Sequence, residues 1–404
     1  MLTRLESLIT PSRVRACAWV LIGVNLLASI VWVATLHGLL DVFNQPLGGD
    51  FVIFYGTSSL TLHGHALAAF DPAQLLAAER AAVPGSPPGL LWCYPPTFQL
   101  IIAPLALLPF VAAYAAWLAV SFVIYFALIR RLSDHRMALM LACAFPGFVV
   151  AAMQGQNGFL TTGALGFGLL LLDRRPWLAG AILGLLVCKP QFGVLLPVLL
   201  IGTGRWRSVA GAALSGLGLM AFSAVVFGLG AWEAFFRGLP DVSAALSNGA
   251  IPWAKIPSTY VALAWLGAPK PLAYAVHAGV ALAACVTTLV AWRGPAPHSL
   301  KVGLAVLATL CVTPYSFNYD LVMLAIPIAV TAEYGREHPL PPGTLIALIL
   351  AFIAPNAFLG IAKATHVQLM PVAIIACFVA VARVARLATH EKYVDRAVLA
   401  LRPA

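Results

Sequence analysis

Two charged residues are candidates for a functional site because each places a reactive group within an apolar stretch. The first is Asp50, in the sequence Gly48-Gly49-Asp50-Phe51. A carboxylate there can accept a proton from a substrate hydroxyl, and the two glycines leave it little steric cover. An aspartate that caps a helix or lies in a solvated loop explains the pattern as well. The residues alone leave both interpretations open.

The second charged residue is Lys189, in Cys188-Lys189-Pro190-Gln191 between two apolar runs. A buried ammonium is costly unless it is paired, so a lysine inside a membrane segment indicates function. Its natural partner is an anion such as a lipid phosphate. The alternative is a lysine whose charged end extends to the membrane interface.

Uncharged polar side chains gather in two further stretches. Residues 154–158, Gln-Gly-Gln-Asn-Gly, predict a turn between two apolar runs. Its amides could hydrogen-bond sugar hydroxyls, although a plain turn explains them too. Residues 313–320, Thr-Pro-Tyr-Ser-Phe-Asn-Tyr-Asp, hold more hydroxyl, amide and carboxylate groups than a turn requires.

The residue pattern offers no metal or cofactor site. The seven cysteines are scattered, without the paired spacing of a disulfide framework or a zinc site. The histidines lack metal-ligand spacing, and the sequence has no phosphate-binding glycine loop, zinc motif or nucleophile elbow. We therefore expect chemistry carried by side chains, with no metal and no cofactor.

The composition indicates that the helices that position these residues lie in a lipid bilayer. Of 404 residues, 61% are apolar and 9% are charged, whereas a soluble domain carries about 25% charged residues. The net charge of +10 does not indicate nucleic-acid binding, because the basic residues occur as short groups between apolar runs. Such groups are typical of the cytoplasmic loops of a membrane protein.

We predict an all-α polytopic membrane protein with about twelve transmembrane helices. Each apolar run approaches the length of about 20 residues that crosses the hydrocarbon. The predicted crossings are 15–36, 109–129, 137–153, 158–173, 177–188, 190–203, 207–229, 272–292, 300–314, 320–334, 342–359 and 367–387.

The basic residues predict the orientation of these crossings, with both termini cytoplasmic. The chain has 24 lysines and arginines, and most fall in segments assigned to the cytoplasm. The outer segments hold only Arg80, Lys189, Arg237, Lys255, Lys270 and Lys363. This orientation places Asp50, Lys189 and both polar stretches on the outer side.

Two outer segments are longer than turns, 37–98 and 231–260. In the first, Asp71-Pro-Ala-Gln predicts a capped helix start, and the apolar stripe that follows favours a helix on the membrane surface. Tyr94-Pro95-Pro96 begins a half-helix that reaches Pro104 or Pro109. We expect a single transmembrane domain with a long, structured first outer loop.

These motifs, in this order, resemble glycosyltransferase family 87, a family of the GT-C type. The resemblance covers roughly residues 45 to 330. Around residues 318–320 mycobacterial members carry histidine, whereas this chain has Asn-Tyr-Asp, so no catalytic histidine is carried over. The matching motifs are Gly49-Asp50-Phe51, Phe70-Asp71-Pro72, Tyr94-Pro95-Pro96, Trp117, Gly155-Gln156-Asn157, Lys189-Pro190-Gln191, Thr313-Pro314 and Tyr319-Asp320.

The resemblance implies a GT-C fold and an inverting transfer of a sugar from a polyprenyl-phosphate donor. The sugar would be mannose or another hexose, and the acceptor an envelope glycolipid or glycan. Asp50 would be the catalytic base and Lys189 would bind the donor phosphate. The residues left to bind substrate are Tyr94, Gln156, Asn157, Gln191, Asn318, Tyr319 and Asp320.

The resemblance also implies a place for the protein and its partners. It would lie in the bacterial plasma membrane, surrounded by membrane lipids, with its active site on the outer face and no nucleic acid as partner. A secondary transporter of about twelve helices is the main alternative, although transporters tend to contain repeats, and none is found here. A non-catalytic membrane scaffold or a flippase partner is a further alternative.

Overall fold

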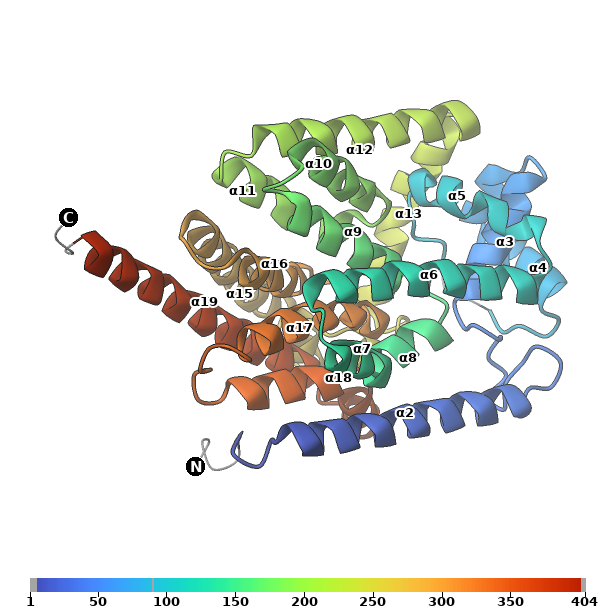
Figure 1. Ribbon diagram of the computed structural model, residues 1–404. Helices are drawn as coiled ribbons and strands as arrows, with labels where there is room; N and C mark the ends of the chain where they lie inside the picture. The colour runs from blue at the N-terminus through green and yellow to red at the C-terminus, as the bar shows by residue number, and fades with distance from the viewer. Residues whose placement is uncertain (1–5, 89–90, 401–404) are drawn as a thin grey trace.

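The computed structural model describes residues 6–88 and 91–400, the last ten of them by their backbone only. Over these residues the chain is helical, and its only β-type pairings are isolated bridges around Leu40. Figure 1 shows long helices that run side by side across the molecule, with a group of shorter helices at one end. Residues 1–5 and 401–404, which bear on the predicted location of the termini, lie outside the described residues.

Within the described residues, six helices are long and apolar enough to cross a membrane. A seventh candidate is the pair α7 (Arg136–Ala144) and α8 (Pro146–Met153), which is bent by 52° at its break. Pro146 accounts for the bend, because proline disfavours helical backbone at the residue before it. The chain is therefore a multi-pass membrane protein. The six helices are α2 (Pro11–Ala34), α6 (Phe110–Leu132), α12 (Trp206–Phe227), α15 (Lys270–Arg293), α18 (Thr344–Thr365) and α19 (Met370–Ala400).

The remaining predicted crossings are also helical but shorter than about 20 residues, the length that a full crossing requires. Several end at a polar stretch, where the helix gives way to 3₁₀ turns. The count of twelve crossings therefore stays a prediction. The short elements are α9 (Gly158–Leu171), α10 (Pro176–Gly184), η3 (Leu185–Cys188), η4 (Pro190–Phe192), α11 (Leu195–Gly202), α16 (His298–Val312), η6 (Asn318–Leu324) and α17 (Ala325–Tyr334).

The first long outer segment folds into short packed helices. The predicted cap of α4 (Pro72–Ala82) is confirmed, since the Asp71 carboxylate accepts hydrogen bonds from the Ala73 and Gln74 amides. The apolar side of α4 packs against α3 (Phe51–Leu62), a helix that the sequence did not predict. The half-helix begins at Pro96 as predicted. The other elements of this segment are η1 (Ala66–Phe70), α5 (Pro96–Ile102) and η2 (Ala103–Leu107).

The second long outer segment forms α13 (Leu229–Ser247), η5 (Trp253–Lys255) and α14 (Thr259–Trp265). The Gln368 side chain from the start of α19 donates hydrogen bonds to the carbonyl oxygens of Ala254 and Ile256. These bonds connect the segment to the transmembrane helices.

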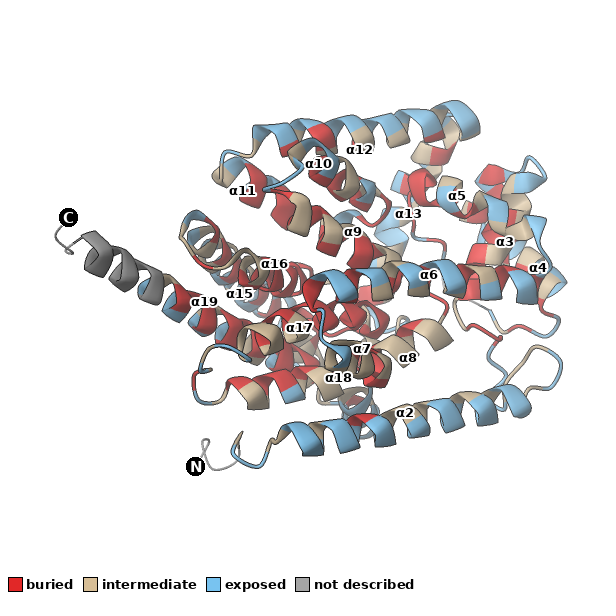
Figure 2. Cartoon of the chain, in the orientation of Figure 1, coloured by how far each residue is buried: buried red, intermediate tan, exposed pale blue. Residues whose placement is uncertain are grey.

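The two largest apolar cores of the described residues lie on either side of the predicted site. The larger surrounds α16, whose residues from Val302 to Leu310 are almost wholly buried. The smaller is an aromatic cluster around Phe54 that includes Trp92, Tyr94 and Trp117. In Figure 2 α16 is mostly buried and α2 mostly exposed. Tyr94 belongs to the smaller core and Tyr319 to the larger, so the predicted site lies where the cores meet.

Candidate functional site

The polar residues predicted from the sequence come together from five elements. Asp50 precedes α3, and Tyr94 lies just before α5. Gln156 and Asn157 form the turn between α8 and α9 that the sequence predicted. Lys189 joins η3 to η4, and Asp320 lies in the first turn of η6. All of these residues lie at or next to breaks between helices. The breaks let polar side chains from separate elements point toward one another.

Asp50 is held by the side chain of Gln156. The Gln156 amide Nε2 donates to Asp50 Oδ2 at 2.9 Å. Its Oε1 atom accepts a hydrogen bond from the Tyr94 hydroxyl, also at 2.9 Å. Both ends of the Gln156 amide are therefore engaged, which sets its orientation and leaves Asp50 with a second carboxylate oxygen for a substrate.

The turn that carries Gln156 is packed against the loop that carries Asp50. Gly155 has a φ of +56°, and a Cβ atom there would lie 2.5 Å from Phe51 Cβ and 2.8 Å from the Gly48 carbonyl oxygen. Only glycine fits this backbone and this spacing. The Trp117 indole N–H also donates to the Gly155 carbonyl at 2.9 Å. The glycines of the two turns thus bring Gln156 within reach of Asp50.

Lys189 is buried and paired. Its Nζ lies 2.6 Å from Asp320 Oδ1 and 2.9 Å from Asn157 Oδ1. The side chains of Lys189 and Asp320 are 2% and 0% exposed. The rings of Phe192 and Tyr319 lie 5.1 and 4.9 Å from the ammonium. A desolvated ammonium needs such partners, because burying an isolated charge is far more costly than burying a pair.

Asp320 and Tyr319 contact the lysine from η6. The second oxygen of Asp320 accepts the Phe317 backbone N–H at 2.9 Å. The Phe317 and Tyr319 rings stack with an interplanar angle of 6°. The Asn157 backbone N–H also donates to Gln156 Oε1 at 3.4 Å, so Asp50 and Lys189 are members of one network that runs through Gln156 and Asn157 and includes Tyr94.

Some polar atoms beside this network have no partner among the described residues. Asn318 is 0% exposed, and neither its amide nitrogen nor its amide oxygen makes a hydrogen bond. Ser316 Oγ and Gln154 Oε1 are also unpartnered. Buried groups of this kind are rare, because each forfeits its hydrogen bonds to water. Asn318 is thus a candidate ligand contact, whereas Gln191 is half-buried on η4 and takes no part in the network.

Glu79 is a buried carboxyl group that the sequence reasoning missed. It shares the inner side of α4 with Leu75 and is 1% exposed, and its Oε2 atom has no partner among the described residues. It packs on α3 at Gly56, where a Cβ atom would lie 3.2 Å from Glu79 Cγ. Burial raises the pKa of Glu79 to about 7, and the charge of Asp50 adds to the effect. The available signal was its spacing of four residues from Leu75.

No three His, Cys, Asp or Glu side chains within residues 6–88 and 91–400 come together in a way that could hold a metal ion. The charged groups that the site offers a substrate are the Asp50 carboxylate, the Lys189 ammonium and its partner Asp320. This set can accept a proton at one end and stabilise an anion at the other.

The described residues are helical, and several of their helices are long and apolar enough to span a membrane. The protein is thus a polytopic membrane protein with a buried polar site. Residues 92–314, more than half of the chain, match the model of glycosyltransferase family 87. The chain belongs to this family and is therefore a glycosyltransferase, which has a sugar donor and an acceptor as substrates. The family resolves the choice between a glycosyltransferase and a transporter.

The matched residues include Tyr94, Gln156, Asn157 and Lys189, whereas Asp50 lies before them and Asp320 after them. Searches of curated proteins and of solved structures found no further match to the chain.

Proposed function

We propose that this protein is an inverting glycosyltransferase that moves a hexose, such as mannose, from a polyprenyl-phosphate donor to an envelope glycolipid or glycan. The observation that carries the proposal is the hydrogen-bonded link between Asp50 and Lys189 through the adjacent residues Gln156 and Asn157. It joins a proton acceptor and an anion-binding group in one site, the two functions that this transfer requires.

In the proposed reaction Asp50 acts as the general base. The acceptor hydroxyl gives its proton to the carboxylate while its oxygen forms a bond to the anomeric carbon of the donor sugar. The bond from this carbon to the phosphate oxygen breaks on the opposite side, and the phosphate leaves with the electron pair. Attack opposite to the leaving group inverts the configuration. Gln156 positions Asp50 through its 2.9 Å hydrogen bond.

Lys189 is proposed to bind the donor phosphate. An ammonium has three N–H donors, and two of those of Lys189 point to Asn157 and Asp320. The third can be donated to a phosphate oxygen, on which charge grows as the sugar departs. A fixed cation in a desolvated site stabilises this charge more strongly than it would in water. Asn318, Tyr94 and Tyr319 are proposed to hydrogen-bond the hydroxyl groups of the sugar.

A lipid-linked donor suits a site that is formed by membrane-spanning helices. The donor's polyprenyl tail resides in the bilayer, so an enzyme whose helices cross the membrane meets it there without extracting it. The charge distribution predicts that the arginine-rich ends of the helices are cytoplasmic. The proposed reaction therefore takes place on the outer face of a bacterial plasma membrane.

Replacing Asp50 with asparagine tests the proposed base. Membranes that contain the protein are given a synthetic polyprenyl-phosphate mannose and an extract of envelope lipids, and sugar transfer is followed by mass spectrometry. We expect Asp50→Asn to lower the rate by at least about 10²-fold, the usual contribution of a general base. Asp241→Asn, at an exposed carboxylate on α13, is the matched control and should retain full activity. Full activity in Asp50→Asn would remove Asp50 from the catalytic role.

A paired replacement tests the phosphate contact. Lys189→Gln combined with Asp320→Asn removes both charges and leaves neither buried charge unpaired. We expect the apparent KM for the polyprenyl-phosphate donor to rise at least about tenfold, as the loss of one charge-assisted hydrogen bond implies. The KM for the acceptor should change little. An unchanged donor KM in a folded double variant would exclude the contact.

The same assay with donors that carry glucose, galactose or arabinose identifies the sugar.

A further inference from the structure

A cavity of about 430 Å³ lies between the start of α2 and the helices α7, α17 and α18, and no residue of the polar network lines it. Its volume is in the range of roughly 300–1,000 Å³ that ligand pockets occupy. Most of its lining is apolar, which suits a hydrocarbon chain. The main apolar contacts are Val14, Met137, Leu141, Phe145, Ile328 and Phe352.

One wall of this cavity is a helix with few protein contacts. Ala18 is the only residue of α2 that is buried, and in Figure 1 α2 lies along the side of the molecule. The apolar side chains of α2 that face away from the protein therefore face lipid. A cavity between such a helix and the main body lies beside the acyl chains of the bilayer.

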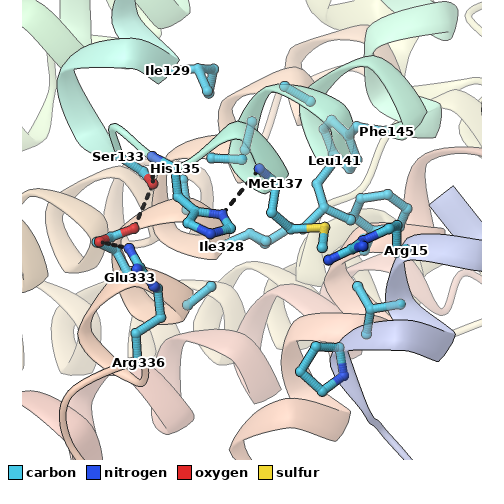
Figure 3. Close-up of a pocket in the computed structure, with 18 of the residues that line it drawn as sticks. Arg15, Ile129, Ser133, His135, Met137, Leu141, Phe145, Ile328, Glu333 and Arg336 are labelled. Carbon is cyan, nitrogen blue, oxygen red and sulfur yellow. Dashed lines mark hydrogen bonds and ion pairs between the residues drawn. The ribbon is translucent and has the colours of Figure 1, made fainter.

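The charged groups of the cavity leave a positive charge unbalanced. Glu333 is paired with Arg336 at 2.6 Å and also accepts a hydrogen bond from the Ser133 hydroxyl. Arg15 is exposed, and among the described residues it has no carboxylate partner. In Figure 3 Arg15 lies on one side of Met137, and Glu333 and Arg336 lie on the other. An anion beside Arg15 would balance the charge.

We propose that this cavity binds an anionic glycerophospholipid of the bilayer, with one acyl chain in the apolar part and the phosphate on Arg15. The combination of an apolar cavity in contact with lipid and an uncompensated arginine at its edge carries this assignment. It concerns a second site, which does not include any residue of the polar network. A basic pocket between helices is a known way to recognise anionic headgroups.

Native mass spectrometry of the whole protein tests the proposal. Delipidated protein is mixed with equal amounts of phosphatidylglycerol and phosphatidylcholine, and the bound lipid is identified. We expect a preference of about fivefold for phosphatidylglycerol, the effect of one basic residue near an anionic headgroup. Arg15→Gln should abolish the preference. Arg131→Gln, an exposed arginine at the end of α6 outside the cavity, should keep it. Equal binding of the two lipids, or equal loss in both variants, would overturn the proposal.

A bulky replacement tests whether the acyl chain enters the cavity. Ala329→Trp should fill the apolar space and lower the bound amount of either lipid, whereas Val120→Trp on the exposed side of α6 should not. Unfolding temperature and elution volume check the fold, and the arginine variants decide the question if Ala329→Trp does not fold. Excess inorganic phosphate should not displace the lipid. Displacement by phosphate, or undiminished binding in folded Ala329→Trp, would contradict the assignment.

Discussion

The ion pair of Lys189 and Asp320 and that of Arg336 and Glu333 have the same length of 2.6 Å and lie at the two ends of the segment made by η6 and α17. They differ in exposure. The first pair is 2% and 0% exposed, and the second is 52% and 35% exposed. Water therefore solvates and screens the second pair but not the first, and each buried charge depends on its partner.

The difference in exposure agrees with the different functions proposed for the two regions. At the end with the exposed pair, Arg15 is also exposed and has no carboxylate partner among the described residues, which suits a headgroup that binds and leaves. In the region of the buried pair, hydrogen bonds fix both charged groups: Lys189 donates to Asn157 Oδ1, and Asp320 accepts the Phe317 backbone N–H. A fixed arrangement suits a catalytic site, because its groups need no rearrangement as charge develops.

The largest expected effect is on the buried pair. Lys189→Ala leaves the Asp320 carboxylate desolvated and unpaired, so we expect a loss of about 3–5 kcal/mol in the free energy of unfolding. Arg336→Ala, at the exposed pair, should cost less than about 1 kcal/mol. Thermal unfolding in detergent measures both. Equal shifts in the two variants would show that burial does not distinguish the pairs.

A smaller effect is expected from the glycines of two turns. Gly155→Ala forces alanine into a left-handed backbone at a cost of about 1–2 kcal/mol, and the contact with Phe51 adds about 1–3 kcal/mol. At Gly204 φ is +69° and no atom lies within 4 Å of a Cβ atom, so Gly204→Ala should cost only the free energy of the left-handed backbone. The same unfolding measurement compares them. Sugar transfer should fall only in Gly155→Ala, and its retention there would contradict the role of this turn in placing Gln156.

The smallest effect concerns two carboxyl groups of the α4 region with opposite pKa shifts. The pKa of Glu79 rises from 4.5 to about 7 on burial, so the folded state holds its proton more tightly than the unfolded state does. Stability should therefore fall as the pH rises through this window, by an amount on the order of 1–3 kcal/mol. Glu79→Gln should remove this part of the pH dependence, as seen in unfolding temperatures between about pH 5 and pH 8.

Asp71 provides the control for this measurement. Hydrogen bonds from Gln74 and Ala73 hold the pKa of its carboxyl below the usual value, so its contribution is lost only as the pH falls through that lowered pKa. Asp71→Asn should leave the slope between about pH 5 and pH 8 unchanged. If Glu79→Gln keeps the slope of the unaltered protein, Glu79 is not the group that titrates.

Much of the site could be predicted from the sequence because its residues mark breaks between apolar runs. Lys189, the turn at residues 154–158 and the stretch at 313–320 each interrupt a run, and the structure brings all three together. Glu79 was missed because it lies inside an ordinary helix, where a single glutamate is typical of a solvated surface. Helix α3 was missed because the long outer segment was interpreted mainly through its caps and prolines.

The pairing of the predicted residues could not be derived in the same way. Lys189 was expected to meet a lipid phosphate, and its partner in the structure is Asp320, which the sequence placed only among the substrate-binding residues. Either anion satisfies a buried ammonium, and composition does not choose between them. The choice depends on how η6 packs so that Asp320 reaches Lys189, which no local pattern encodes.

The sequence by itself determined that lipid surrounds this protein, that a helix begins after Asp71, and which polar residues interrupt the apolar runs, because hydropathy, capping and charge act over short stretches of chain. Only the tertiary structure decided that Gln156 donates to Asp50 across 106 residues and that Lys189 pairs with Asp320 across 131. Such contacts arise from the packing of helices at glycine turns, and packing depends on all the helices at once.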